Sequence, residues 1–197
     1  MTLLIIGLIL FLGLHLLPTA PAARNGIRDS LGAVPYQIIY SVLSLIGLVL
    51  IIKGFADLRG TRADIQLYTP PAFMRHITML LMWPAFILLA AAYIPSRIRT
   101  AAKHPMLASL KLWAFAHLLV RGDLAGVLLF GSFLAYGIYD RISVKKRAVL
   151  GPLGAAKGGA GGDLAAVAAG TVAYGLMLVW GHAWLIGVPL VHFSFGP

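Results

Sequence analysis

The chain has 197 residues, of which 60% are apolar and 11% are charged, and its mean hydropathy is +0.90. This composition is too apolar for a water-soluble protein, so we expect one membrane domain over residues 1–197 in contact with the lipid bilayer. The net charge of +10 suggests nucleic-acid binding, but the basic residues lie between apolar runs, as in loops beside a membrane. We therefore expect no nucleic-acid partner. The absence of cysteine excludes disulfides, thiolate metal sites and a cysteine nucleophile.

The first apolar segment, residues 3–17, predicts a helix that ends near Pro18 and Pro21. It has no basic start and no small-residue cleavage pattern, so we expect a retained helix and not a signal peptide. Each apolar segment approaches the roughly 20 residues that cross a membrane. The sequence therefore predicts an all-α, polytopic bundle of about six transmembrane helices. The five further segments cover residues 36–52, 71–94, 105–120, 124–139 and 164–191.

The basic residues between these helices divide unequally between the two sides of the membrane. Ten lie on one side and five on the other, so the positive-inside rule places the richer side in the cytoplasm. Both termini should then face outward, which is the periplasm if the membrane is a bacterial inner membrane. The cytoplasmic set is Arg24, Arg28, Arg97, Arg99, Lys103, Arg141, Lys145, Lys146, Arg147 and Lys157, and the outer set is Lys53, Arg59, Arg62, Arg75 and Arg121.

Small residues mark two features near the C-terminus. Residues 151–162 are rich in glycine but lack the spacing and the preceding strand of a phosphate-binding loop, so they predict a flexible connection. Ala165, Ala169 and Ala173 recur every four residues, a spacing that lets two helix backbones approach closely. We expect this face to pack within the bundle or in a homodimer.

Ionisable side chains at membrane depth are the candidates for function, because burying them in lipid is costly. His117 is the strongest, since it shares one helical face with Trp113 and Arg121, and this face should point into the bundle and line any bound cofactor. A hydrogen bond to a neighbouring helix would explain His117 equally well. Lys111 points away from this face, and we expect its long side chain to reach the membrane surface. The ionisable set is His15, His76, Lys111, His117 and His182.

The other histidines have simpler explanations. His15 lies near the end of the first helix, where an interfacial position is the common one, and His104 precedes Pro105 and flanks the fourth helix. His182 lies among tryptophans of the kind found at membrane surfaces. No histidine is accompanied by serine and aspartate as hydrolysis requires, and no pair of carboxylates lies at membrane depth. Imidazole alone in an apolar bundle suits haem iron best, with basic residues at helix ends pairing with the propionates.

Three segments carry a family resemblance: GLHLLP at 13–18, YTPPAFMRHITMLLMWPAFILLAAAYIP at 68–95, and KHPMLASLKLWAFAHLLVRGDLAGVLLFG at 103–131. They resemble the NnrU family of bacterial membrane proteins, whose name comes from an association with nitrite and nitric-oxide reduction in denitrification. The family is related to 15-cis-ζ-carotene isomerase, which binds haem b through two histidines. The resemblance implies haem b here, with His15 and His117 as ligands. The isomerase has a cysteine where this chain has Ala114, which removes a thiolate and weakens the expectation of isomerase activity.

Depth in the membrane tests this ligand pair. We expect the Cα atoms of His15 and His117 to differ in depth by roughly 10–13 Å. Two imidazole side chains with two bonds of about 2 Å span a similar distance, so one iron would need a steep Fe–N axis. His104 is nearer to His15 in depth but about 20 Å from His117 along one helix, so His15 with His104 is the rival pair.

Three classes of function stay open on these residues. The first is a haem protein acting in redox chemistry or in redox-gated isomerisation of a polyene, as a haem-dependent isomerase would. The second is a non-catalytic factor that helps to assemble a nitrite or nitric-oxide reductase. The third is a small-molecule transporter, which the lack of carboxylates at membrane depth and of visible inverted repeats disfavours.

Overall fold

The computed structural model describes residues 1–148 and 151–191, and most of these residues are helical. They form two compact units, each of which is assembled from two stretches of chain: Met1–Thr78 with Ala114–Val149, and Met79–Trp113 with Leu150–Pro197. The helices are α1 (Thr2–Leu16), α2 (Pro21–Leu31), α3 (Ala33–Leu58), α4 (Met74–Ala91), α5 (Arg97–Ala102), α6 (Pro105–Leu118), α7 (Leu124–Lys146), α8 (Ala160–Leu176) and α9 (His182–Ile186), with a 3₁₀ turn at Leu17–Thr19 and a π-helical turn at Met177–Gly181.

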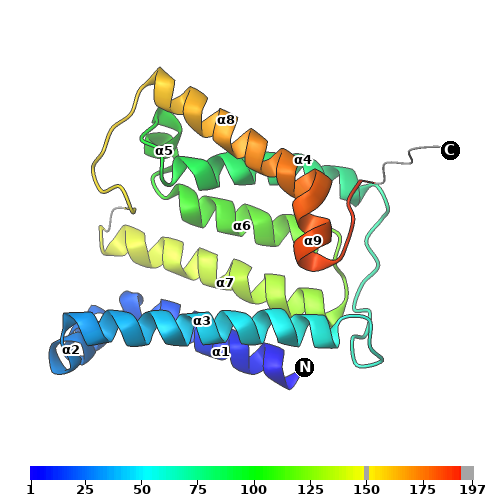
Figure 1. Cartoon of the computed structure of the whole chain (residues 1–197), viewed down its shortest axis with the longest axis horizontal. Helices are drawn as coiled ribbons and strands as arrows, with labels where there is room; N and C mark the ends of the chain where they lie inside the picture. The colour runs from blue at the N-terminus through cyan, green and yellow to red at the C-terminus, as the bar shows by residue number, and fades with distance from the viewer. Residues whose placement is uncertain (149–150, 192–197) are drawn as a thin grey trace. The chain divides into compact units, whose positions relative to one another are not determined.

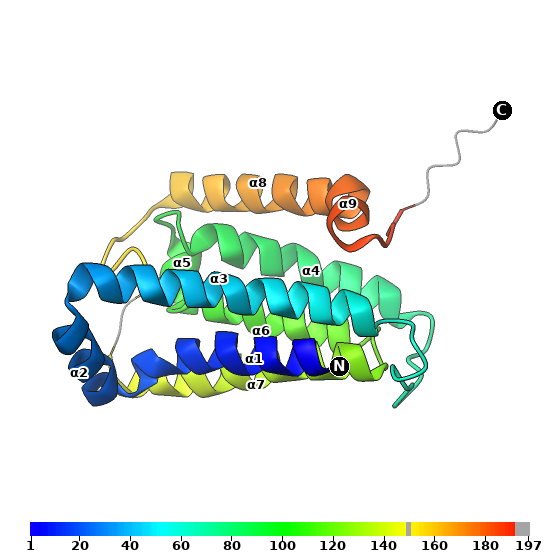
Figure 2. The same ribbon diagram turned by 60° about the horizontal axis from the view of Figure 1, so that its bottom comes forward.

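In the first unit, α1, α3 and α7 lie side by side (Figures 1 and 2). α1 and α3 run antiparallel and approach so closely that glycine is required between them. A Cβ added at Gly54 would lie 2.2 Å from the backbone nitrogen of Leu4, and one at Gly7 would lie 2.6 Å from that of Ile51. Such contacts let two apolar helices gain dispersion energy where lipid supplies no hydrophobic driving force.

The segment between α3 and α4 is fastened to the turn that joins α6 and α7. The backbone N–H groups of Leu67 and Tyr68 both donate to the Gly122 carbonyl, and Leu124 N–H donates to the Ile65 carbonyl. Asp64 accepts from the Ala125 N–H at 2.8 Å. These bonds hold the C-terminal end of α6 and the first turn of α7 in a fixed position relative to α3.

In the second unit, α8 lies along α4 (Figure 1). Trp83 Nε1 donates to Thr171 Oγ1 at 2.9 Å, and the Tyr174 hydroxyl donates to the Met79 carbonyl at 3.0 Å. At the far end, Asp163 in the first turn of α8 accepts from the backbone N–H of Arg97 and pairs with its guanidinium. The C-terminal part of α8, at Tyr174, therefore contacts the N-terminal part of α4, at Met79. The N-terminal part of α8, at Asp163, contacts the start of α5, so α8 and α4 are antiparallel.

The small residues of α8 pack on a different face from the one that we predicted. Ala166 and Gly170 are the buried positions, whereas Ala165, Ala169 and Ala173 are exposed. The prediction of an intramolecular packing face at Ala165, Ala169 and Ala173 is therefore wrong, because the stripe one residue further along the chain is the one that packs within the unit. A homodimer through the exposed stripe stays a prediction.

The glycine-rich connection before α8 is anchored at a cationic side chain. Arg99 is only 7% exposed, and its guanidinium donates to the carbonyls of Ala156 and Gly154. The N–H of Arg99 is in turn held by Ser96 Oγ at the N-cap of α5. This connection is thus tied to α5, although its composition alone predicts flexibility.

Several predicted helix bounds need correction. α3 and α7 extend beyond their predicted ranges, and α2 lies in a region where no helix was expected. α9 ends at Ile186, short of residue 191, because Gly187 adopts a left-handed conformation with φ 74°. α2 ends for a similar reason at Gly32, with φ 84°.

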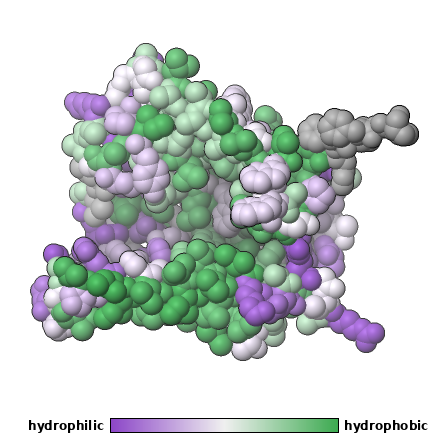
Figure 3. Space-filling view, viewed as in Figure 1, coloured by the Kyte–Doolittle hydropathy of each residue, from purple (hydrophilic) through white to green (hydrophobic). Residues whose placement is uncertain are grey.

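Five helical stretches within the described residues are long and apolar enough to cross a membrane: Thr2–Thr19, Ala33–Leu58, Met74–Ala91, Leu124–Lys146 and Ala160–Ile186. The sixth predicted span, α6, has 14 residues and an axial length of about 21 Å, below the usual requirement. Figure 3 shows the outer face of α3 as a band of hydrophobic residues with hydrophilic residues near its ends. The protein is therefore an all-α membrane protein that crosses the bilayer several times.

Candidate functional site

His15 is held in one defined orientation in the last turn of α1. Its Nδ1 lies 2.7 Å from the carbonyl oxygen of Phe11, and its ring stacks on the Phe11 ring with centroids 4.2 Å apart. A carbonyl can only accept, so this hydrogen bond requires the proton on Nδ1 and leaves the lone pair on Nε2. Metal-ligating histidines are commonly oriented in this way, with one ring nitrogen donating to a carbonyl and the other free to bind.

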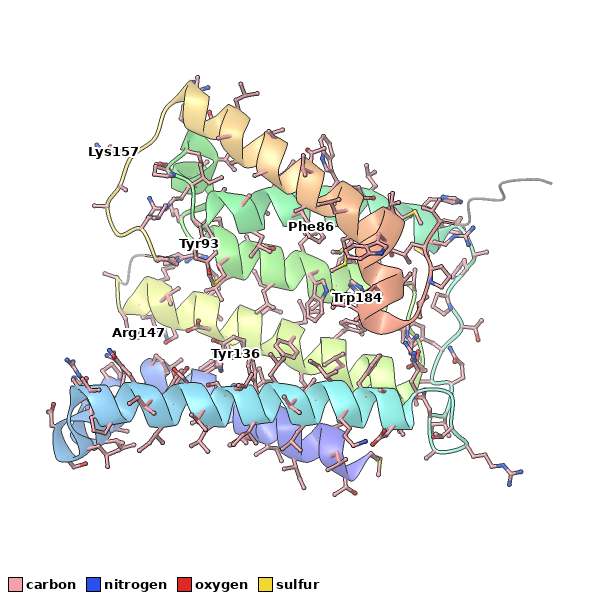
Figure 4. The ribbon with its side chains drawn as sticks, viewed as in Figure 1. Phe86, Tyr93, Tyr136, Arg147, Lys157 and Trp184 are labelled. Carbon is pink, nitrogen blue, oxygen red and sulfur yellow. The ribbon has the colours of Figure 1, made fainter. Side chains whose placement is uncertain are left out.

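Tyrosine rings from two other helices lie near His15. Tyr40 of α3 and Tyr136 of α7 have ring centroids 5.8 and 6.3 Å from the imidazole. Figure 4 labels Tyr136 on α7. Ser44 lies one turn after Tyr40 on the same face of α3, and its buried Oγ has no hydrogen-bond partner. A buried hydroxyl without a partner is costly in a membrane helix, so this part of α3 has unused hydrogen-bonding capacity.

Asp140 lies one turn after Tyr136 on α7 and binds its hydroxyl. The Tyr136 hydroxyl donates to Asp140 at 3.4 Å, and the Arg147 guanidinium donates to the same carboxylate at 3.3 Å. Sequence reasoning treated Tyr136 and Asp140 as part of an apolar helix and its flanking loop. Their spacing of four residues on one helix was the signal that could have found them.

His117 lies in the last turn of α6 and stacks on Phe130 of α7, with ring centroids 4.5 Å apart. Phe130 in turn packs edge to face with Phe55 of α3, at 6.4 Å. The backbone carbonyl of His117 accepts from the N–H groups of Val120 and Arg121, which close the end of the helix. His117 is therefore half-buried in the first unit, among aromatic rings from two other helices.

Both predicted ligands pack against α7, at positions six residues apart. His117 contacts Phe130 and His15 contacts Tyr136, and these two α7 residues lie about 9 Å apart along the helix axis. Between them, the Phe11 ring lies against Phe133, at a centroid distance of 5.8 Å. Each imidazole therefore belongs to an aromatic cluster of the first unit, His15 with Phe11 and Phe133, and His117 with Phe130 and Phe55.

Arg121, predicted to face a cofactor, is paired with an acid. Its Nε lies 2.8 Å from Asp123 Oδ2 and its Nη2 lies 2.9 Å from Oδ1, while the guanidinium sits 5.6 Å from the Phe55 ring centroid. The Tyr68 hydroxyl donates to the carbonyls of Leu118 and Arg121. Partial burial and the Asp123 carboxylate raise the pKa of Tyr68 above its usual value. This hydroxyl therefore stays protonated as a donor and fixes the turn after His117.

His104 and Trp113 belong to the second unit. His104 follows a strained tight turn, in which Lys103 has φ 62° and the His104 N–H donates to the Ala102 carbonyl at 2.7 Å. A non-glycine residue in this conformation costs roughly 1–3 kcal/mol. His15 and His117 share one unit and His104 does not, but both candidate ligand pairs remain predictions.

Lys111 gives a direct check of the helical wheel for α6. Ala114 is completely buried, whereas Phe115, which lies one turn after Lys111 on the same side, is 47% exposed. We expect Lys111→Met to leave folding and any bound cofactor unchanged, because the lysine points away from the face of Trp113 and His117. Size-exclusion elution and the absorbance spectrum of the purified variant measure this. Loss of a cofactor spectrum in the Lys111→Met variant would show that the assignment of the helix faces is wrong.

Comparison with known proteins identifies the family. The sequence model of the family described as NnrU protein matches residues 3–190, which is nearly the whole chain. No curated protein and no solved structure matches the chain. Together with the long apolar helices, the match means that this chain is a multi-pass membrane protein that belongs to the NnrU family.

Proposed function

We propose that the protein binds haem b through the imidazoles of His15 and His117 and takes part in nitrite or nitric-oxide reduction. The observation that carries the proposal is the packing of both histidines in one unit against α7, on Phe130 and Tyr136, whose axial offset is about 9 Å. Two imidazole side chains with two iron–nitrogen bonds of about 2 Å span such an offset. The link to denitrification rests on the family, whose name comes from it.

The residues present fit a haem in their donor chemistry. His15 holds its proton on Nδ1 and has Nε2 available to bind iron. No group of three or more histidine, cysteine or acidic residues in the described part of the chain could hold a metal ion, but haem needs only two imidazoles from the protein.

The fit also sets a structural requirement. Phe11 stacks on the His15 ring and Phe133 packs against Phe11, so these two rings would have to leave room for a macrocycle bound at His15. In this arrangement the aromatic side chains that pack against the two histidines would contact the macrocycle. The guanidinium of Arg121, which is paired with Asp123, would lie at the edge of the macrocycle. Bound haem would supply one-electron redox chemistry, and the histidines and aromatic rings would position it and exclude water.

The absorbance spectrum of the purified protein tests this proposal. Protein expressed with ample haem supply should show a Soret band and, after reduction, sharp visible bands of a low-spin, six-coordinate iron. A protein that carries no Soret band under these conditions would remove the haem proposal and leave the non-catalytic assembly factor in its place. If the haem absorbance spectrum changed transiently when a polyene was added, the result would instead favour the isomerase.

We also propose that the protein lies in the bacterial inner membrane with both termini in the periplasm. The asymmetry of ten basic residues against five supports this orientation. A phosphatase reporter, which is active only in the periplasm, should be active when fused after Pro197, outside the described residues, and inactive when inserted near Lys146. A fusion after Pro197 that works only with a cytoplasmic reporter would reverse the orientation.

A further inference from the structure

A surface hollow of about 560 Å³ lies at the C-terminal end of α7, in the first unit. Four residues of the last two turns line it: Arg141, Ile142, Lys145 and Lys146. Three of the four are cationic, and the fourth is an isoleucine with 52% exposure. The hollow therefore combines strong positive charge with an apolar wall.

The positive charge of this hollow is not neutralised nearby. Asp140 is the adjacent acid, and Arg147 engages its carboxylate at 3.3 Å. Among the described residues, neither Arg141 nor the two lysines forms an ion pair. The negative end of the α7 dipole compensates only a fraction of three charges. A ligand that carries at least one full negative charge would thus gain electrostatic energy here.

The apolar wall continues along the helix in one direction. Ile138 and Tyr139, one turn before Ile142, are 49% and 53% exposed. On a helical wheel the cations and these three residues share one half of α7. Because α7 is long and apolar enough to cross the membrane, this strip would lead from the cations into the hydrocarbon layer. It includes Tyr139, and tyrosine is a residue type enriched at membrane surfaces.

We infer that this end of α7 is a binding site for the phosphate headgroup of an anionic phospholipid, with an acyl chain lying along Ile142 and Ile138. The three cations are complementary in charge to the phosphate, and the apolar strip can pack against an acyl chain of the same lipid molecule. A soluble phosphate would use only the cations. Each lysine or arginine close to an anionic membrane surface contributes about 1 kcal/mol, so the three together should change lipid affinity by about a hundredfold.

Native mass spectrometry of the detergent-purified full chain can measure lipid retention directly. The probes are phosphatidylglycerol, which is anionic, and phosphatidylcholine, which is zwitterionic. The test variant is Arg141→Gln/Lys145→Gln/Lys146→Gln. The matched control is Arg28→Gln/Arg62→Gln/Arg75→Gln, which removes three charges from exposed positions elsewhere. If the test variant fails to elute as a folded species, Lys145→Gln/Lys146→Gln, at two exposed positions, replaces it.

We expect the wild type and the control to retain phosphatidylglycerol over phosphatidylcholine, and the test variant to lose this preference by about a hundredfold, or by about thirtyfold for the double variant. Millimolar inorganic phosphate should not displace the bound lipid. Equal retention by the test variant and the wild type would overturn the site, as would equal losses in the test variant and the control. Displacement by inorganic phosphate would show that the hollow binds phosphate and not a lipid. None of these outcomes depends on haem.

Discussion

His117→Ala should remove the low-spin haem spectrum of the purified protein completely. The imidazole is half-buried against Phe130, and the chain has no cysteine to replace it as a ligand. His15→Ala should either remove the spectrum or convert it to a high-spin form, because one remaining nitrogen ligand leaves the iron five-coordinate or bound to water. The measurement is the absorbance spectrum of the oxidised and dithionite-reduced proteins, normalised to protein concentration.

His182→Ala is the matched control for these two variants. The Nδ1 of His182 also lies 2.7 Å from a backbone carbonyl, that of Val188, so its local geometry resembles that of His15. It belongs to the second unit, and its substitution should leave the spectrum intact. A low-spin spectrum that survives in His117→Ala and disappears in His104→Ala would replace our ligand pair with His15 and His104.

Gly54→Ala should destabilise the protein by about 1–3 kcal/mol, because the added Cβ would lie 2.2 Å from the Leu4 nitrogen and force α1 and α3 apart. The clash is with backbone, which cannot rotate away as a side chain can. Unfolding of the purified protein by denaturing detergent, followed by circular dichroism, gives the change in unfolding free energy.

Gly13→Ala provides the comparison for Gly54→Ala. A Cβ at Gly13 would meet nothing within 4 Å, and alanine favours the helix over glycine by up to about 1 kcal/mol. We expect this variant to be as stable as the wild type or slightly more so. Equal stability of Gly54→Ala and Gly13→Ala would contradict the close packing of α1 on α3.

The helices were predictable because long apolar runs punctuated by proline and charge leave few alternatives in lipid. The start of α6 at Pro105 and that of α7 after Asp123 follow from local signals, proline at the first helical position and an aspartate that caps the Gly126 N–H. α2 was missed because its sequence is polar and amphipathic, so a search for apolar spans passes over it.

Features that depend on tertiary contacts were not predictable. Two small-residue stripes run along α8, and only packing against other helices decides that Ala166 and Gly170 are the buried ones. Arg99 looked like one more loop cation, since its role depends on carbonyls more than fifty residues away. The candidate ligands His15 and His117 came from a family resemblance, whereas the tyrosine rings of Tyr40 and Tyr136 near His15 appear only once α1, α3 and α7 are placed together.

The most direct test of the account is near-infrared magnetic circular dichroism of the oxidised, detergent-solubilised protein, because the charge-transfer band of low-spin ferric haem reports both axial ligands. We expect the charge-transfer band to lie at the position typical of two neutral imidazole ligands, because His15 and His117 belong to the same unit. A band typical of one imidazole with water or another ligand, or no haem at all, would contradict the proposal that these two histidines hold the cofactor together.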